Sequence, residues 1–182
     1  MARMASKSVT AHELLLMPGG RHCELLRGEV VRVSPAGYQH GDIVTQLVER
    51  IGPFVRSRGL GRYVSGEIGF WIERNPDTVR APDGAFLRKE RAEKLIGHRG
   101  FVDGPPDLAI EVLSPTDRRR DALAKCRAWI GAGAETAVLI DPDRRTATVF
   151  TTAGETEFDE HAVLRLDPVL PDLALPLAEL FA

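Results

Sequence analysis

The residue with the clearest chemical potential is Glu111, a carboxylate in the middle of an otherwise apolar segment, Asp107–Leu113. Strand alternation places Glu111 on the same face as Ala109 and Leu113, and both faces of the segment are apolar enough to be covered. An ionised carboxylate in such a place costs roughly several kcal/mol unless a cation or hydrogen-bond donors meet it. Glu111 is therefore predicted to pair with another side chain or to hold a metal ion.

A second carboxylate, Asp83, belongs to the segment Val79–Leu87, which is predicted to be a strand. If this strand lies beside the one that contains Glu111, the two carboxylates meet near one point. Two close carboxylates repel each other unless a cation lies between them. Mg²⁺ prefers one or two carboxylates together with water and phosphate oxygens, so the pair predicts a Mg²⁺ site for phosphate chemistry, with Mn²⁺ as a substitute. Taken alone, Asp83 is also typical of a turn, because it lies between a proline and a glycine.

Lys125 is the third element, and it lies on the helix predicted from residue 117 to about residue 130. It falls near the flank of the apolar side of that helix, from which its amine can reach over the end of the sheet toward Glu111. Arg118 begins the same helix, in the only tight run of arginines in the chain. Two structural readings stay open: Glu111 and Lys125 can form a simple ion pair, or Asp121 and Lys125 can form an exposed helical pair.

The length and composition of the chain are those of an ordinary globular protein. The 182 residues suit one domain, 1–182, with residues 1–9 as a flexible tail, and 43% of the residues are hydrophobic and 27% charged. The net charge of -2 argues against a strongly basic, nonspecific nucleic-acid binder, so any contact with DNA needs a local patch. Two cysteines are too few for a disulfide framework and favour a reducing cytoplasm, and no apolar run reaches membrane-spanning length.

The pattern along the chain predicts an α/β protein. A capping box at Thr10–Glu13 starts a short helix, two runs at Cys23–Leu26 and Glu29–Ser34 form a hairpin, and Tyr38–Arg58 is the longest helix. The elements predicted after them are strands at Arg62–Glu73, Val79–Leu87, Asp107–Leu113, Thr136–Ile140 and Thr146–Thr151, helical turns at Arg88–Ile96, a loop at Gly100–Pro106 and an extended tail that becomes helical at Leu177–Leu180.

The central order of these elements is helix-strand-strand-strand-helix-strand, which predicts a mixed sheet with helices packed on it, extended by the N-terminal helix and hairpin. The apolar end of the chain, Leu173–Phe181, can cover either the core of its own chain or that of a second copy, so a homodimer stays open.

At these residues the chain resembles the PD-(D/E)XK nuclease superfamily and, more closely, the Uma group of restriction-endonuclease-like proteins. The matching segments, in order over residues 22–142, are Cys23–Val30, Ser34-Pro35 with His40, Ala81-Pro82-Asp83, Pro105–Pro115, Asp121 with Lys125, and Asp141-Pro142. Each segment alone is a weak signal, whereas their order and spacing together are fairly specific.

The resemblance implies a restriction-endonuclease-like fold and a Mg²⁺-dependent endonuclease that acts on DNA and leaves a 5′-phosphate. Carried over, Asp83 and Glu111 would bind the metal and Lys125 would position or activate the attacking water. The usual lysine position of the superfamily, two residues after the acidic residue, is Leu113 here. In the Uma group that lysine is moved to the following helix, which Lys125 matches. The usual tyrosine after it is Trp129.

Three further residues match the pattern or lie near it. Glu24 could be an additional metal ligand or could support one, or it could be a surface strand residue. His40 could contact a phosphate or a carboxylate, or be an exposed or capping histidine, and Arg118 could hold the DNA backbone. Asp107 is expected to form a hydrogen bond where its strand begins and not to bind metal.

Two alternatives to the nuclease stay open, because fold does not fix function. The first is a catalytically inactive module on the same fold that binds nucleic acid or protein, which the slight negative charge favours. The second is an assembly protein whose carboxylates are purely structural.

Overall fold

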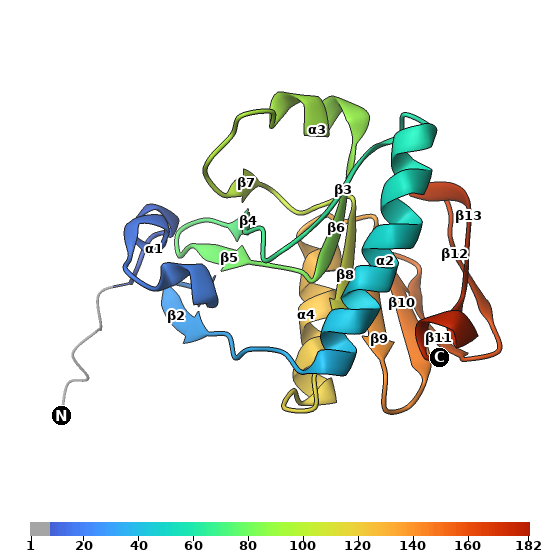
Figure 1. The fold of residues 1–182 in the computed structure, drawn as a ribbon. Coiled ribbons are helices and arrows are strands. Elements are labelled where there is room, and N and C mark those ends of the chain that lie inside the picture. The colour runs from blue at the N-terminus through green and yellow to red at the C-terminus, as the bar shows by residue number, and fades with distance from the viewer. Residues whose placement is uncertain (1–7) are drawn as a thin grey trace.

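A computed structural model describes residues 8–182, and its centre is a six-stranded mixed sheet (Figure 1). The strands lie in the order β11-β10-β9-β8-β6-β3. Their bounds are β3 Gly61–Ser65, β6 Gly84–Arg88, β8 Leu108–Val112, β9 Thr136–Asp141, β10 Thr146–Thr151 and β11 Gly154–Asp159. Strands β8 and β9 run parallel, and the other neighbours run antiparallel.

Two helices cover this sheet on opposite faces. Helix α2, Tyr38–Ser57, packs through residues such as Leu47 on the face that carries Ile110. Helix α4, Arg119–Gly131, packs through Trp129 on the face that carries Ala109. All five residues of β8 are buried as a result, which is why Glu111 on this strand lies in the interior.

A second, five-stranded sheet lies on the N-terminal side, in the order β2-β1-β5-β4-β7 (Figure 1). Its strands are β1 Cys23–Leu26, β2 Glu29–Arg32, β4 Phe70–Glu73, β5 Thr78–Arg80 and β7 Val102–Asp103. Helix α1, Ala11–Leu16, begins at the predicted capping box, in which Thr10 and Glu13 bond each other's backbone N–H groups. A 3₁₀ turn, Gly20–His22, joins α1 to β1.

The C-terminal part packs on its own chain. Strands β12, Val163–Leu166, and β13, Leu170–Pro176, form a hairpin that leads into the short helix α5, Leu177–Leu180. The apolar side chains of this part are buried in the same core as α2. The C-terminal segment therefore covers the protein's own core, one of the two options that the sequence left open.

The order α2-β3-β6-β8-α4-β9 confirms the predicted core, but two predicted strands were wrong. The segment Arg62–Glu73 divides into β3 and β4, and Val79–Leu87 divides into β5 and β6, with the parts in different sheets. The first break follows from a turn at Gly66 and Glu67, both of which have positive φ. The second lies at Pro82, which has no N–H to donate to a strand ladder.

Smaller differences concern loops and caps. The predicted loop Gly100–Pro106 contains the two-residue strand β7, and the region after residue 151 contains three strands that were predicted only as an extended tail. The helix predicted from residue 117 begins two residues later, after the cap residue Arg118, and the Asp117 carboxylate accepts from the Ser114 N–H at 2.9 Å.

The predicted flexible tail covers residues 1–9, of which residues 1–7 lie outside the described part of the chain. Val9 is described, and its N–H donates to the Gly28 carbonyl at 2.9 Å. None of the helices described has the length and apolarity needed to cross a membrane.

The turn between α2 and β3 generates a prediction about Gly61. A Cβ at this position would lie 2.0 Å from the Leu87 carbonyl oxygen, a backbone atom of the neighbouring strand β6. Gly61→Ala should therefore lower the free energy of unfolding by about 3 kcal/mol, because the two strands must move apart. Gly41→Ala is the matched control: a Cβ there meets nothing within 4 Å, and alanine favours the helix by up to about 1 kcal/mol. Urea denaturation measures both, and equal stability of the two variants would contradict the close approach.

Candidate active site

Asp83 and Glu111 lie beside each other at the same level of the sheet, Asp83 directly before β6 and Glu111 on β8. Strand β6 begins at Gly84, which pairs with Ile110 of β8, so Asp83 precedes the ladder directly beside Glu111. Asp83 does not lie within a strand, as predicted, but in the bend between β5 and β6. Its carboxylate accepts from the Val112 N–H at 2.7 Å, and its own carbonyl accepts from the Ser65 hydroxyl at 2.8 Å. The bend is thereby held in place at both the side chain and the backbone.

Glu111 is buried, and each of its carboxylate oxygens has a partner on α4. Trp129 Nε1 donates to Oε1 at 2.7 Å, and Lys125 Nζ lies 3.0 Å from Oε2. Lys125 and Trp129 are four residues apart and therefore lie on the same face of the helix. One helical turn thus binds both oxygens of the carboxylate.

The ammonium group of Lys125 lies between three acceptors. Besides Glu111, it contacts Glu24 Oε1 at 2.8 Å and donates to the Ala81 carbonyl at 2.7 Å. An ammonium has three protons to donate, so all of its hydrogen-bonding capacity is used. The exposed helical pair of Lys125 with Asp121 was wrong, because Asp121 lies on the surface with Arg120.

Glu24 joins the two sheets at this point. It lies on β1 and is only 8% exposed, so the alternative of a surface strand residue was wrong. Its Oε1 also accepts from the Ala81 N–H at 3.1 Å, and Arg80 lies 3.7 Å from its Oε2. Glu24 therefore holds the segment that leads to Asp83. It is also linked to Glu111, because both carboxylates contact the ammonium of Lys125.

Burial and neighbouring charges shift the protonation of this group. Burial and the nearby carboxylates of Asp83 and Glu24 raise the pKa of Glu111 to about 7, against the opposing effect of Lys125. Burial lowers the pKa of Lys125, but the carboxylates of Glu111 and Glu24 outweigh it, so the net shift is upward and the ammonium keeps its proton. The group therefore holds a surplus of negative charge around one firmly protonated amine.

His40 lies on the other side of Asp83, where α2 begins. Its Nε2 is 3.3 Å from Asp83 Oδ1, and its side chain is only 13% exposed. Of the roles that the sequence allowed for His40, the structure therefore shows contact with a carboxylate. The hydrogen bond with Asp83 raises the pKa of His40. Its Nδ1 is buried and has no hydrogen-bond partner among the described residues.

Arg118 and Asp107, also considered from the sequence, lie apart from this centre. Arg118 is exposed at the start of α4 and has no ion-pair partner within residues 8–182. The next arginine, Arg119, is bound by Asp141 at 3.2 Å and by Glu157 at 2.5 Å. Asp107 accepts from the Arg88 N–H at 2.9 Å where its strand begins, as expected.

Two hollows open beside the candidate centre. The larger, of about 380 Å³, is lined by Glu24, Asp83 and Lys125 together with Arg80 and other residues. The smaller, of about 230 Å³, includes His40 in its lining. Asp83 and its surroundings are thus reachable from outside, although Glu111 itself is buried.

Three contributors to the site were not identified from the sequence. Arg80 lines the larger hollow, and its Nε is buried without a hydrogen-bond partner among the described residues. The Tyr63 hydroxyl is also buried without a hydrogen-bond partner among the described residues, and burial followed by the charge of Asp83 raises the pKa of that phenol. The carbonyl of Ala81 binds Lys125. Nothing in the type or spacing of these residues distinguishes them from ordinary strand residues, because their role depends on which strands become neighbours.

The donors suit a hard cation. No group of three or more His, Cys, Asp or Glu within residues 8–182 is arranged to hold a metal ion, but Mg²⁺ commonly uses only one or two carboxylates and completes its shell with water. Asp83 and Glu111 provide such a pair, and three carboxylates face the two permanent cations Lys125 and Arg80. The residues therefore fit the predicted Mg²⁺, whose binding stays a prediction.

The raised pKa of Glu111 generates a prediction about stability. The folded protein binds this proton more tightly than the unfolded chain, whose carboxyl has a pKa of 4.5. The resulting stabilisation is complete below about pH 4.5 and is lost as the pH rises through about 7. Glu111→Gln removes the titration and keeps an acceptor for Trp129. Relative to this variant, the wild type should lose about 3 kcal/mol of unfolding free energy between pH 4.5 and pH 8. Chemical denaturation at several pH values measures the difference, and a difference that stays constant would show that Lys125 keeps Glu111 ionised throughout.

Comparisons with known proteins agree with this architecture. A crystal structure of a protein described as "a putative nuclease belonging to DUF820" from Anabaena variabilis ATCC 29413 superposes with a TM-score of 0.81. The two proteins are 22% identical, and the match covers 95% of this chain and 97% of the other, which establishes a shared fold. No curated protein matches the chain.

The sequence profile of one family, Uma2, described as "Putative restriction endonuclease", matches residues 10–178. These residues include every element from α1 to β13 and all of the side chains that surround Asp83 and Glu111. With nearly its whole length matched, the chain belongs to the Uma2 family of restriction-endonuclease-like proteins.

Proposed function

We propose that this protein is a Mg²⁺-dependent endonuclease that hydrolyses phosphodiester bonds in DNA. The observation that carries the proposal is the convergence of two carboxylates, that of Asp83 directly before β6 and that of Glu111 on β8, with the partly buried ammonium of Lys125. Membership of a restriction-endonuclease-like family supports the same class of reaction. The two free thiols, Cys23 and Cys126, fit a reducing compartment such as the cytoplasm.

In this proposal Asp83 and Glu111 hold Mg²⁺, with Glu24 as an additional or supporting carboxylate. The ion, when bound, would polarise a phosphate oxygen and lower the pKa of a water molecule that attacks the phosphorus. By the resemblance to PD-(D/E)XK nucleases, the product would carry a 5′-phosphate. Mn²⁺ would substitute for Mg²⁺, because it prefers the same oxygen ligands.

The role of Lys125 follows from its raised pKa. An amine that keeps its proton cannot act as a general base. In this proposal the contact of Lys125 with Glu111 loosens when the metal binds, and the freed N–H would orient water and stabilise negative charge that develops on the phosphate. Its present contacts with Glu24 and Glu111 hold the ammonium at the centre of the carboxylates.

Two cations on the rim of the centre can contact the substrate. Arg80 lines the larger hollow and His40 lines the smaller one. A protonated side chain of either type donates hydrogen bonds, which suits phosphate oxygens that enter these hollows. Arg118, exposed at the start of α4, could hold the backbone farther away, where it would position the DNA without reading its sequence.

A catalytically inactive module that binds nucleic acid or protein is the second candidate. One observation favours it: every oxygen of Asp83 and Glu111 already has a partner within the protein. Such a module would bind its ligand without turnover and without affinity for divalent metal. The two experiments below separate it from the nuclease.

The first experiment replaces Asp83. Asp83→Asn keeps an oxygen to accept from the Val112 N–H but removes the negative charge that would hold the cation. Cleavage of DNA by the purified protein in Mg²⁺ or Mn²⁺ should fall about 100-fold or more, as it does when a major electrostatic contribution to catalysis is lost. Asp172→Asn is the matched control, since Asp172 is exposed and its positive φ of 66° suits asparagine. Cleavage of single-stranded, duplex and supercoiled DNA that survives Asp83→Asn would contradict the assigned centre.

The second experiment measures metal binding directly. Calorimetric titration with Mn²⁺ should give one site in the wild type, and both Asp83→Asn and Glu111→Gln should weaken it about tenfold or more, because each removes one of two charged ligands. Chelation with EDTA should abolish cleavage, and added Mg²⁺ should restore it. Equal Mn²⁺ affinity in the wild type and both variants would place any metal elsewhere.

A further inference from the structure

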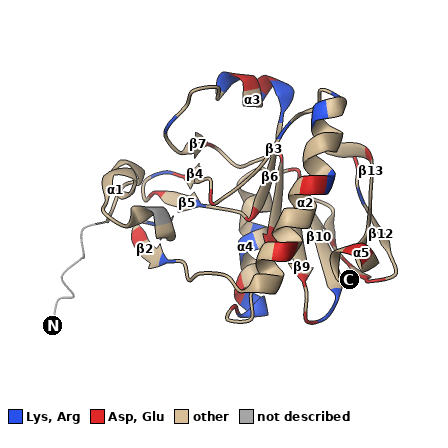
Figure 2. Ribbon diagram, viewed as in Figure 1, with Lys and Arg blue, Asp and Glu red and all other residues tan. Residues whose placement is uncertain are grey.

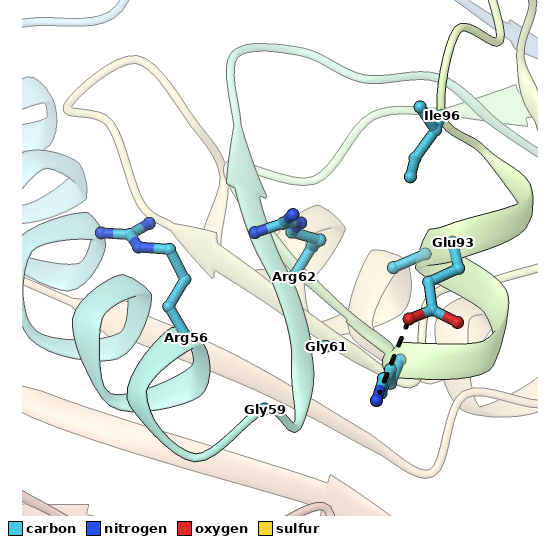
Figure 3. A pocket seen from close by; sticks show the side chains of 8 residues that line it. Arg56, Gly59, Gly61, Arg62, Glu93 and Ile96 are labelled. Atoms are coloured by element: carbon cyan, nitrogen blue, oxygen red, sulfur yellow. Dashed lines mark ion pairs between the residues drawn. The ribbon is translucent and has the colours of Figure 1, made fainter.

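A basic pocket lies at the far end of β3 from the candidate centre, where α2 ends and α3, Lys89–Lys94, begins (Figure 3). It has a volume of about 230 Å³, and its charged lining residues are Arg56, Arg62, Lys89 and Glu93. Figure 3 shows the side chains of Arg56 on α2 and Arg62 on β3 on the same side of the Gly59–Gly61 turn. Figure 2 shows Lys and Arg on α3 and at the nearby end of α2.

The two arginines of this pocket lack a compensating carboxylate. Among residues 8–182 no ion pair involves Arg56 or Arg62, whereas Lys89 lies 4.0 Å from Glu93. Many other arginines of the protein, such as Arg88, Arg119 and Arg127, do have carboxylate partners. Two unpaired guanidinium groups on one pocket favour an anion, and the planar guanidinium matches the oxygens of a phosphate.

The basic pocket is connected to the candidate centre by a chain of hollows. Arg62 also lines a second hollow, of about 520 Å³, which is bordered by His98 and Arg99. That hollow shares lining residues with the one beside Asp83. The shared residues are Gly66, Glu67, Gly69 and Phe101. The hollows therefore adjoin one another between the two sites. One carboxylate, that of Glu67, lies among the shared residues, 3.9 Å from His22.

The strand register gives the length of this path. Arg62 pairs with Leu87 and Ser65 with Gly84, so four residues of backbone separate Asp83 from the level of Arg62. At about 3.3 Å per residue this is roughly 13 Å along the strand. A DNA strand with one phosphate at Asp83 can thus place another of its phosphates at Arg56 and Arg62.

We infer that Arg56 and Arg62 form a phosphate site that anchors the DNA backbone roughly 13 Å from the candidate centre, as measured along β3. The inference rests on the proposed function, because it takes DNA as the ligand. Around Asp83 the three carboxylates offset the positive charge of Lys125 and Arg80, so a cationic contact away from the centre adds attraction for a polyanion. The site would position the strand without reading its bases.

The test measures binding of fluorescently labelled 20-nucleotide DNA, single-stranded and duplex, by anisotropy in the presence of EDTA. Arg62→Ala and Arg56→Ala should each weaken binding about tenfold, as the loss of a charged hydrogen bond does. The slope of log K against log salt should become shallower by about 0.7 for single strands and 0.9 for duplex with each arginine removed. Arg62→Lys should retain part of the affinity. Arg165→Ala is the matched control, because Arg165 is exposed on β12 and has no ion-pair partner in the described chain.

The outcomes distinguish this inference from the proposed function. If the wild type binds DNA and the arginine variants, with unchanged melting temperatures, bind as tightly as Arg165→Ala, the phosphate site is wrong and the nuclease proposal is untouched. If binding depends on the arginines but no cleavage occurs in Mg²⁺ or Mn²⁺, the site stands and the nuclease proposal fails. A wild type that binds neither form of DNA overturns both.

Discussion

The arrangement of the candidate site depends on one partly buried ammonium, that of Lys125. Lys125 Nζ binds Glu24 of β1, the Ala81 carbonyl between β5 and β6, and Glu111 of β8. A buried ammonium is costly unless its donors are satisfied, and here all three have acceptors. Since those acceptors belong to both sheets while the lysine belongs to α4, this single group fixes the two sheets and the helix relative to one another.

The two central carboxylates, Asp83 and Glu111, differ in how accessible they are, because only Glu111 contacts this ammonium. Glu111 is enclosed between Lys125 and Trp129, whereas Asp83 is held by a backbone N–H and by His40 at the edge of the hollow, with a side chain 26% exposed. An incoming cation would therefore meet Asp83 first. In the proposed function, Glu111 would become a ligand only if its contact with Lys125 loosens. The strength of that ion pair therefore opposes metal binding.

The sequence was sufficient to predict the core and the identity of the central residues, because both depend on local pattern. The apolar period of Tyr38–Arg58 and the apolar run around Glu111 specify a helix and a buried strand whatever surrounds them. The breaks at Gly66 and Pro82 were missed, since a strand that leaves one sheet for another keeps its alternation on both sides of the break. For the same reason Arg80, Tyr63 and the Ala81 carbonyl could not be found: they reach the site only through the pairing of β1 with β5 and of β3 with β6, contacts between segments far apart in the sequence.

The position of the lysine on α4 has a physical consequence for the whole molecule. In the usual arrangement of the superfamily the amine follows two residues after the acidic residue on the same strand, and that position is here Leu113, which is buried in the core that α4 covers. The amine instead depends on the docking of α4, which is secured by Cys126 and Trp129, both fully buried. Lys125 and Trp129 lie one turn apart, so the side chain that anchors the helix also binds the carboxylate that the lysine faces. Any rotation or shift of α4 on the sheet would move both contacts to Glu111 together, which makes the geometry of the site inseparable from the packing of this helix.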